Sequence, residues 1–256
     1  MSWDQNVVIK SKAEIAIMRE AGRVNAAALA AVLEMLNPGV TTADLDAAAA
    51  EIIRKHGGKP VFKGYPGPYP YPATICASVN DELVHGIPGK RKLKDGDIIS
   101  IDCGTQLDGF IGDSAITAGV GEISPEAQRL LEVTGQSLYV GIEKMRAGNR
   151  VGDVSSAIQK FVEGQGFHVT PVYTGHGVGR QMHEGPQVPN YGIPGRGMTL
   201  RPGMTIALEP MVLVGTPNTR VLADKWTVAS ADGSLTAHFE HSVAVTEGDP
   251  IILTLP

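Results

Sequence analysis

The sequence contains little cysteine and no long apolar run. Its two cysteines, Cys76 and Cys103, lack C-x-x-C spacing and so do not make a zinc knuckle, and a structural disulfide would be unusual in a reducing compartment. The most apolar stretch, residues 26–36, carries Glu34 and is shorter than the roughly 20 residues of a bilayer span. Residues 1–12 lack the basic segment and apolar run of a secretory signal. We therefore expect a cytoplasmic protein with no membrane segment.

Charge of one sign is also scarce. The 22 basic and 27 acidic residues give a net charge of -5, and neither sign forms a long run. The single basic cluster, residues 89–94, is typical of a solvated turn before a strand. The sequence thus predicts no nucleic-acid partner. Apolar material is ample, because 43% of the 256 residues are hydrophobic, which is enough for the core of one large domain or two small ones.

Two helices and a stiff loop are expected in the first third of the chain. Apolar residues recur at helical spacing over residues 12–36, and this helix should end at the Asn-Pro-Gly that follows. Residues 41–58 predict a second helix, since Thr and Asp cap candidates open the segment and two glycines close it. Residues 61–76 include four prolines between positions 66 and 72, so this segment can form neither a helix nor a central strand.

Residues 97–120 predict a β-hairpin. β-branched residues flank Asp108-Gly109, the dipeptide favoured by a two-residue hairpin turn. With that turn, Asp102 lies opposite Ala115, and Asp113 lies two residues along on the same face. Such diagonal neighbours are about 7–8 Å apart, close enough for two carboxylates to converge on shared cations. The alternative, in which one acid faces solvent, is less favoured because apolar residues flank Asp102 on its strand.

The chain contains an internal similarity. Residues 93–102 (LKDGDIISID) resemble residues 200–209 (LRPGMTIALE), and residues 38–57 resemble residues 147–166. Each member of the first pair is a strand that ends on a carboxylate, Asp102 in one and Glu209 in the other. We expect one domain spanning 1–256, built from two related halves at about 12–120 and 121–250, with the carboxylates meeting between the halves.

A cluster of four carboxylates indicates a metal site. The first three acids are Asp102, Asp113 and Glu209. Glu240 is the fourth candidate, because it lies in residues 238–246 (HFEHSVAVT), which show strand-like alternation. Four buried carboxylates without cations would repel one another and lose hydration. Oxygen ligands with one imidazole suit Mn, Fe, Co or Zn, and bridging carboxylates suit two metals.

The glycine-rich residues 175–186 (GHGVGRQMHEGP) offer His176 and His183 as partners of these acids, in what is expected to be a rigid loop. A phosphate cradle is the weaker alternative, because Pro186 and Pro189 prevent a long helix after the glycines. Single histidines in loops are usually solvent-exposed, and we expect that of His56 and His168. We expect His238 and His241, which flank Glu240, to have a structural or supporting role.

Five motifs, in order, carry a family resemblance: SVNDELVHGIP, DGDIISIDCGTQLDGFIGD, GHGVGRQMHEGP, GMTIALEP and DKWTVASADGSLTAHFEHSVAVT. They resemble the type I methionine aminopeptidases of the M24 metallopeptidase family, and the resemblance covers about residues 12–250. It implies the α/β (α+β) pita-bread fold, with two pseudo-symmetric halves around a central antiparallel sheet. It also implies two divalent metal ions (Co, Mn, Fe or Zn), held by Asp102, Asp113, His176, Glu209 and Glu240.

The same resemblance implies roles for further residues. Glu209 is expected to act as general base, His183 to stabilise the oxyanion, and His85 to bind the leaving side of the peptide. Cys76 and Trp226 are expected in the methionine pocket with one tyrosine, for which Tyr71 is preferred over Tyr65 and Tyr69 by its spacing to Cys76. A monovalent cation (Na or K) could bind the backbone carbonyls of Asn80, Glu82 and Thr236, as in some relatives.

The expected function is removal of the N-terminal methionine from nascent chains and peptides whose second residue is small, by a monomer of the bacterial form. We expect the bacterial form because the motifs of the sequence include neither the N-terminal zinc-binding extension nor the long helical insertion of other forms. The alternatives are a proline-specific peptidase of the same fold and a non-catalytic binding protein of that fold. The former generally carries a further N-terminal domain, and the latter predicts the loss of metal ligands.

Overall fold

The structure is a computed structural model and describes residues 6–256. Residues 1–5, part of the stretch used above to argue against a secretory signal, lie outside the described residues. Within the described residues, four helices occur as two consecutive pairs, and each pair is followed by a run of strands. The helices are α1 (Lys12–Glu34), α2 (Thr42–Lys55), α3 (Pro125–Ile142) and α4 (Val151–Gly164). The strands are β1 (Lys59–Pro60), β2 (Ile75–Val79), β3 (Glu82–Val84), β4 (Ile98–Leu107), β5 (Phe110–Gly119), β6 (His168–Val169), β7 (Thr174–Gly177), β8 (Glu184–Pro189), β9 (Thr205–Leu208), β10 (Met211–Leu213), β11 (Thr219–Val221), β12 (Val228–Ser230), β13 (Thr236–His238), β14 (His241–Ala244) and β15 (Ile251–Ile252).

The two predicted helices are confirmed with small shifts at their ends. Helix α1 begins after Ser11, whose side chain accepts a hydrogen bond from the Glu14 backbone while Glu14 bonds back to the Ser11 backbone. It ends at Glu34, two residues before the predicted end. Thr41 and Asp44 form the same reciprocal cap on α2. Residues 61–74 contain no helix or strand, as predicted, but Ile75 and Cys76, the last two residues of the predicted loop, begin β2.

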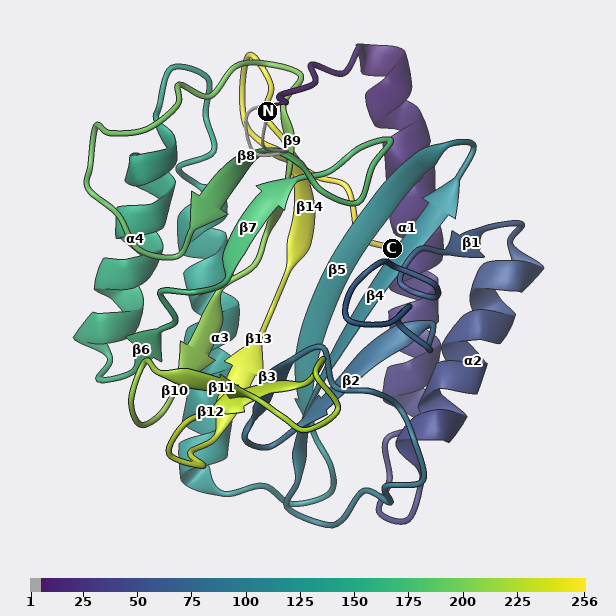
Figure 1. Cartoon of the computed structure of the whole chain (residues 1–256). Coiled ribbons are helices and arrows are strands. Elements are labelled where there is room, and N and C mark those ends of the chain that lie inside the picture. Colours follow the sequence, from purple (N-terminus) through teal and green to yellow (C-terminus); the bar gives the residue numbers. More distant parts are fainter. Residues whose placement is uncertain (1–5) are drawn as a thin grey trace.

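Each pair of helices covers its own antiparallel sheet (Figure 1). Helices α1 and α2 pack against the sheet of β1, β4, β2 and β5, and their contact is a core that includes Leu29, Leu45 and Ile101. Helices α3 and α4 pack against the five-stranded sheet in the order β15-β14-β9-β7-β8, through a core that includes Ile158 and Leu208. The remaining strands form two small sheets, β13-β10-β6 and β11-β12-β3.

Matching local features recur in the two predicted halves. Helices α2 and α4 have the same length of 14 residues and start 109 positions apart, and an aspartate caps each of them at the same place. Gly39 N donates to Leu93 O (2.7 Å), and Gly148 N donates to Leu200 O (3.0 Å). These pairs follow the offsets of the internal sequence similarity. They support the prediction of two related halves, about 12–120 and 121–250, within one domain.

The two sheets meet along β5 and β14, which run side by side in the middle of Figure 1. Glu240 N donates to Ala115 O (2.9 Å), and Ala115 N donates to Glu240 O (3.3 Å). Ser242 Oγ donates to Asp113 O (2.8 Å) and accepts from Asp113 N (3.0 Å). Because both pairs include an acid of the predicted cluster, the junction of the two sheets is also the place where the acids gather.

The hairpin prediction is confirmed, and the strand prediction for residues 238–246 is wrong in one respect. Strands β4 and β5 pair with Asp102 opposite Ala115, and Asp108 (φ 48°) and Gly109 (φ 81°) form the turn. Residues 238–246, by contrast, are not one strand. The chain leaves β13 after His238 and resumes as β14 at His241, because β13 pairs with β10 whereas β14 pairs with β9.

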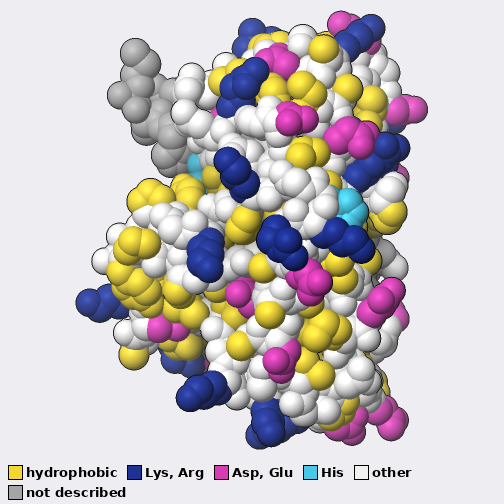
Figure 2. All heavy atoms as spheres, turned by 90° about the vertical axis from the view of Figure 1, so that its right-hand side faces the viewer, with side chains coloured by type: hydrophobic (Ala, Val, Ile, Leu, Met, Phe, Trp, Pro, Cys, Tyr) yellow, Lys and Arg dark blue, Asp and Glu magenta, His cyan; other side chains and the backbone are white. Residues whose placement is uncertain are grey.

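The surface carries charges of both signs. On the face shown in Figure 2, Lys and Arg side chains are interspersed with Asp and Glu. Among residues 6–256, we find no helix with both the length and the apolar composition that a bilayer crossing requires. The predicted basic cluster at 89–94 lies mostly exposed before β4.

Candidate active site

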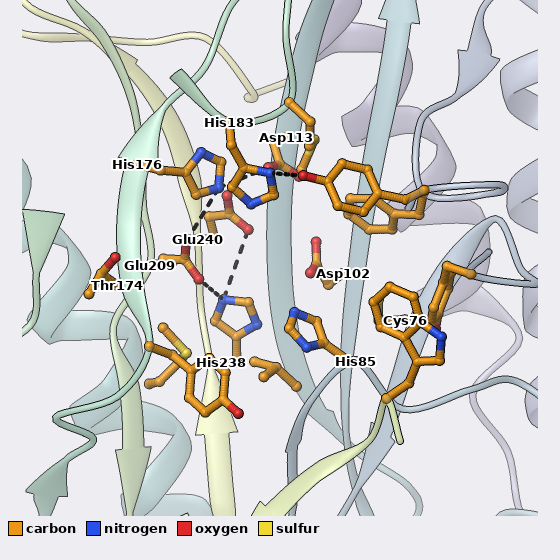
Figure 3. Close-up of a pocket in the computed structure, with 18 residues that line it drawn as sticks. Cys76, His85, Asp102, Asp113, Thr174, His176, His183, Glu209, His238 and Glu240 are labelled. Atoms are coloured by element: carbon orange, nitrogen blue, oxygen red, sulfur yellow. Dashed lines mark hydrogen bonds and ion pairs between the residues drawn. The ribbon is translucent and has the colours of Figure 1, made fainter. Parts of the chain in front are cut away.

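One pocket at the junction of the two sheets brings together all ten side chains predicted from the sequence (Figure 3). We call one side of this pocket the acidic end, which consists of Asp102, Asp113, His176, Glu209, His238 and Glu240. The opposite side is the aromatic end, which consists of Phe62, Tyr71, Cys76 and Trp226. His85 lies between His238 and Cys76, and His183 lies beside His176 and Asp113 at the top of the view.

The four acids reach the pocket from two kinds of backbone position. Asp102 and Asp113 lie on the regular hairpin of β4 and β5. Glu209 and Glu240 lie at interruptions: Glu209 follows the last residue of β9, and Glu240 lies between β13 and β14. The two interruptions face each other, since Phe239 N donates to Pro210 O (3.3 Å). Because the interruptions at Glu209 and Glu240 lie next to each other, both carboxylates can turn toward the hairpin of β4 and β5.

The acidic end fits divalent cations. Ligand atoms of Asp113, His176 and Glu240 all lie within 4.8 Å of one another, and the three side chains are buried. His176 Nε2 lies 3.5 Å from Glu209 Oε1 and 3.8 Å from Asp113 Oδ2. Within residues 6–256, no hydrogen-bond partner is found for three buried carboxylate oxygens, one each on Asp102, Asp113 and Glu240. Buried oxygens without donors are costly, and a cation would satisfy them.

Electrostatics at the acidic end also favour bound cations. The pKa of Asp102 is raised to about 7, chiefly by burial, while His238 lowers it and the charge of Glu209 raises it. Burial likewise raises the pKa values of Asp113, Glu209 and Glu240 well above the ordinary range. Neighbouring acids add to this effect for Asp113 and Glu240. These carboxylates can all be ionised near neutral pH only when positive charge sits among them.

The predicted histidines occupy distinct positions. His176 lies on β7, so the expectation of a loop at this residue is wrong. Its Nδ1 lies 3.0 Å from Gly177 O while Nε2 faces the acids. His183 directly precedes β8, and its Nδ1 lies 2.6 Å from the Tyr65 hydroxyl. Burial lowers the pKa of His176 to about 3 and that of His85 to about 4, so both rings are neutral at physiological pH. Neutral imidazole is the form that binds a metal.

The aromatic end offers an apolar surface. Tyr71 is buried, and its hydroxyl donates to Gly86 O (2.8 Å) and lies 3.1 Å from Ile75 O, so the ring faces the pocket without a free hydroxyl. Its ring meets Trp226 edge-on at 5.2 Å. Burial raises the pKa of the Cys76 thiol well above its usual range, so it is uncharged. This end can therefore contact an uncharged side chain.

The pocket is also lined by residues for which the sequence predicted only a supporting role or no role. His238 lines the pocket, with Nε2 3.6 Å from Glu209 Oε2 and 3.9 Å from Glu240 Oε2, although only a structural or supporting role was expected. Tyr65 lines it too, whereas Tyr69 is 39% exposed and is not part of the lining. The signal for His238 was its place two residues before Glu240, on the same side of an extended chain. Six further lining residues were not predicted from the sequence: Phe62, Val84, Tyr173, Thr174, Met182 and Met211.

The three residues predicted to hold a monovalent cation lie together near this pocket. Thr236 N donates to Asn80 O (2.9 Å), and the Thr236 hydroxyl lies 3.2 Å from Asn80 O and 3.0 Å from Glu82 O. Asn80 has a positive φ of 60°. Two backbone carbonyls therefore converge at one side chain.

Comparisons with known proteins agree with this geometry. The sequence pattern of metallopeptidase family M24 matches residues 16–247. Methionine aminopeptidase 1 of Bacillus subtilis (strain 168) is 50% identical over 248 residues, which cover 97% of this chain and 99% of the relative. The crystal structure of a methionine aminopeptidase from Thermotoga maritima has a TM-score of 0.95 and 46% identity, and covers 98% of this chain and 100% of that one.

A comparison with a more distant structure supports the fold but not the function. Prolidase from Pyrococcus furiosus shares only 21% identity at a TM-score of 0.79, and the match covers 97% of this chain but 66% of that one, so it shows the fold alone. The close matches confirm the predicted pita-bread fold, a mixed α/β architecture with antiparallel sheets. The chain belongs to metallopeptidase family M24 and, within that family, to the methionine aminopeptidases.

Proposed function

We propose that this enzyme removes the N-terminal methionine from peptides and nascent chains whose second residue is small. The observation that carries the proposal is the single pocket, in which an acidic end suited to divalent cations faces an aromatic end suited to an uncharged side chain. The high identity to methionine aminopeptidases over nearly the whole chain supports the same substrate.

The side chains proposed to hold two divalent ions are Asp102, Asp113, His176, Glu209 and Glu240. The partnerless buried oxygens of Asp102, Asp113 and Glu240 and the raised pKa values of the four acids support this assignment. When bound, such ions polarise a carbonyl and lower the pKa of water toward about 7. Co, Mn, Fe and Zn suit a donor set of oxygens with one imidazole.

Glu209 is proposed as the general base. Its side chain is 13% exposed, whereas those of Asp113 and Glu240 are 2% exposed, so among these three Glu209 has the most accessible carboxylate. An accessible carboxylate beside the proposed cations can accept a proton from water and pass it to the leaving amine.

His183 and His85 are proposed to contact the peptide. His183 would donate a hydrogen bond to the carbonyl oxygen as negative charge develops there, an interaction commonly worth about 3 kcal/mol. His85 is held by a strained backbone, with φ at 61°, beside Trp226 at a ring distance of 6.3 Å. From this position between the two ends it would bind the leaving side of the peptide.

The methionine side chain is proposed to lie against Tyr71, Cys76 and Trp226. A flexible thioether packs well on aromatic and sulfur-containing surfaces. We further propose one Na or K ion at the carbonyls of Asn80, Glu82 and Thr236, and a cytoplasmic monomer that acts on nascent chains at the ribosome.

Peptide assays decide between this function and that of a proline-specific peptidase. Peptides Met-X-Met-Ala and Xaa-Pro-Ala should be compared with Mn, Co and Fe as the added metal. We expect release of methionine from Met-Ala-Met-Ala and little cleavage of Xaa-Pro-Ala. Faster release from Xaa-Pro with a first residue other than methionine would reassign the enzyme, and binding without any cleavage would favour the non-catalytic alternative.

A further inference from the structure

The hydrogen bond between Tyr65 and His183 has no place in the functions assigned so far. The Tyr65 hydroxyl lies 2.6 Å from His183 Nδ1, and the two rings are 5.4 Å apart at 60°. In Figure 3 the dashed line ends at one nitrogen of the His183 ring, and the ring's other nitrogen lies lower in the view, on the side of Glu240. One partner thus fixes one nitrogen of a ring whose other nitrogen faces the proposed substrate position.

The roles of the two imidazole nitrogens are linked. In a neutral imidazole one nitrogen carries hydrogen and the other accepts, so a donor at Nδ1 places the hydrogen on Nε2. Tyr65 is suited to donate, because a phenol in a half-buried setting keeps its proton at neutral pH. Nε2–H would then lie on the side of the pocket where Glu240 is labelled in Figure 3, the side on which the reacting carbonyl is proposed to bind.

Tyr65 is itself held in place by the proline-containing loop. Tyr65 N donates to Phe62 O (2.8 Å), and Tyr71 N donates to Tyr65 O (3.0 Å), which closes the base of the loop. At the tip, a Cβ on Gly67 would lie 2.3 Å from Cζ2 of Trp226, so only glycine fits there. The Trp226 indole N–H also donates to Tyr69 O (3.1 Å). A loop fastened at base and tip fixes the hydroxyl with little freedom.

The other two tyrosines of the loop are bonded elsewhere. The Tyr69 hydroxyl donates to Asp224 O (2.8 Å), and the Tyr71 hydroxyl lies close to two backbone carbonyls. We propose that Tyr65 is a positioning residue that donates its hydroxyl hydrogen to His183 Nδ1 and so keeps Nε2–H of His183 facing the substrate. This inference rests on the proposed function, because it assumes that His183 donates to the reacting carbonyl.

The first test compares Tyr65→Phe with Tyr69→Phe as the matched control. Both variants lose one phenol hydrogen bond of the same loop, and only Tyr65→Phe loses the bond to His183. We expect Tyr65→Phe to lower kcat about 5- to 20-fold on Met-Ala-Met-Ala, which corresponds to the loss of about one to two hydrogen bonds. KM should stay within about twofold of its value in the unmodified protein. Tyr69→Phe should keep kcat within about twofold. A rise in KM alone for Tyr65→Phe would show direct substrate contact and overturn the proposal.

Nitrogen NMR of the histidine rings supplies a readout independent of turnover. In protein with ¹⁵N-labelled histidine and saturating Zn²⁺, the His183 signals, assigned with His183→Ala, should show hydrogen on Nε2 and a bare Nδ1. In Tyr65→Phe they should show a mixture of tautomers or the opposite one, and in Tyr69→Phe the pattern of the unmodified protein. An unchanged tautomer in Tyr65→Phe would refute the proposal.

A double variant separates this proposal from the proposed function. If Tyr65 acts through His183, Tyr65→Phe should change the rate less than about twofold in a His183→Ala background. A full additional loss in that background would contradict the proposal. Full activity of His183→Ala alone would instead remove His183 from the proposed mechanism, and the NMR result would still decide what Tyr65 does to the ring.

Discussion

At the acidic end of the pocket, several buried polar atoms of the described chain lack hydrogen-bond partners, whereas at the aromatic end the polar groups are bonded to the backbone. Asp102, Asp113 and Glu240 each leave one buried oxygen without a donor. Tyr71 and Trp226, in contrast, place their polar atoms against backbone carbonyls. The acidic end is therefore completed only by added positive charge, and the aromatic end is complete in itself and presents apolar surface.

The two ends also differ in how they depend on the junction between the sheets. The acidic end takes Asp102 and Asp113 from the sheet of β4 and β5, and its other members from the C-terminal half of the chain. Most of the aromatic end comes from the loop and strand at residues 62–76, and Trp226 covers it. Damage to the junction should thus disrupt the acidic end first.

Removing a charge from the acidic end should have the largest effect. We expect Asp113→Asn and Glu240→Gln each to lower kcat/KM by more than about 10³-fold, because each removes a proposed ligand of the cations. Asp108→Asn is the matched control, since it makes the same chemical change at the exposed turn of the same hairpin. Full turnover by Asp113→Asn or Glu240→Gln at saturating metal would rule out the proposed ligand set.

Removing the proposed oxyanion donor should have the next largest effect. His183→Ala is expected to lower kcat by about 10²-fold or more while metal content, measured by elemental analysis, stays the same. His56→Ala serves as control, because His56 is exposed at the end of α2. If His183→Ala loses metal instead, His176 and His183 have exchanged roles.

The size of the second peptide residue tests the space beside the acidic end. His85, His183 and the stiff loop at 65–72 should leave little room beyond the scissile bond, so Met followed by Gly, Ala or Ser should be cleaved. Met followed by Lys, Leu or Glu should react about 5- to 150-fold more slowly, because overpacking costs about 1 to 3 kcal/mol. Rates of methionine release from a Met-X-Met-Ala series measure this. Equal rates across the series would place the second residue in open space.

The smallest effect concerns the stability of metal-free protein. Asp102 has a folded-state pKa of about 7, above its value of about 4 in an unfolded chain, so between these values the folded state binds more protons. Stability should therefore fall as pH rises from 5 to 7, by about 2 kcal/mol from this group. Urea unfolding of chelator-treated protein measures the slope, which Asp102→Asn should reduce. A metal-free protein that gains stability over this range would contradict the assigned electrostatics.

Local patterns predicted much of this molecule because the features concerned lie close in sequence. The Asp-Gly turn fixed the register that places Asp102 opposite Ala115, and cap residues located the starts of α1 and α2. The family motifs named ten pocket side chains, all of which the structure brings together, while their roles stay predictions.

The features that sequence reasoning missed depend on pairing between distant segments. The alternation of residues 238–246 does not reveal that the strand changes partner from β10 to β9, which interrupts it at Glu240. Spacing to Cys76 favoured Tyr71, which lines the pocket, but it did not reveal that Tyr65 lines the pocket as well.

The number of divalent ions bound tests the contrast between the two ends most directly. Titrating metal-stripped protein with Mn²⁺ or Co²⁺ by calorimetry, with methionine release from Met-Ala-Met-Ala followed in parallel, counts the ions and links them to activity. We expect up to two ions per chain, activity that appears with binding, and loss of binding in Asp113→Asn and Glu240→Gln but not in Asp108→Asn. Undiminished turnover by protein shown to contain no divalent metal would contradict the proposed mechanism.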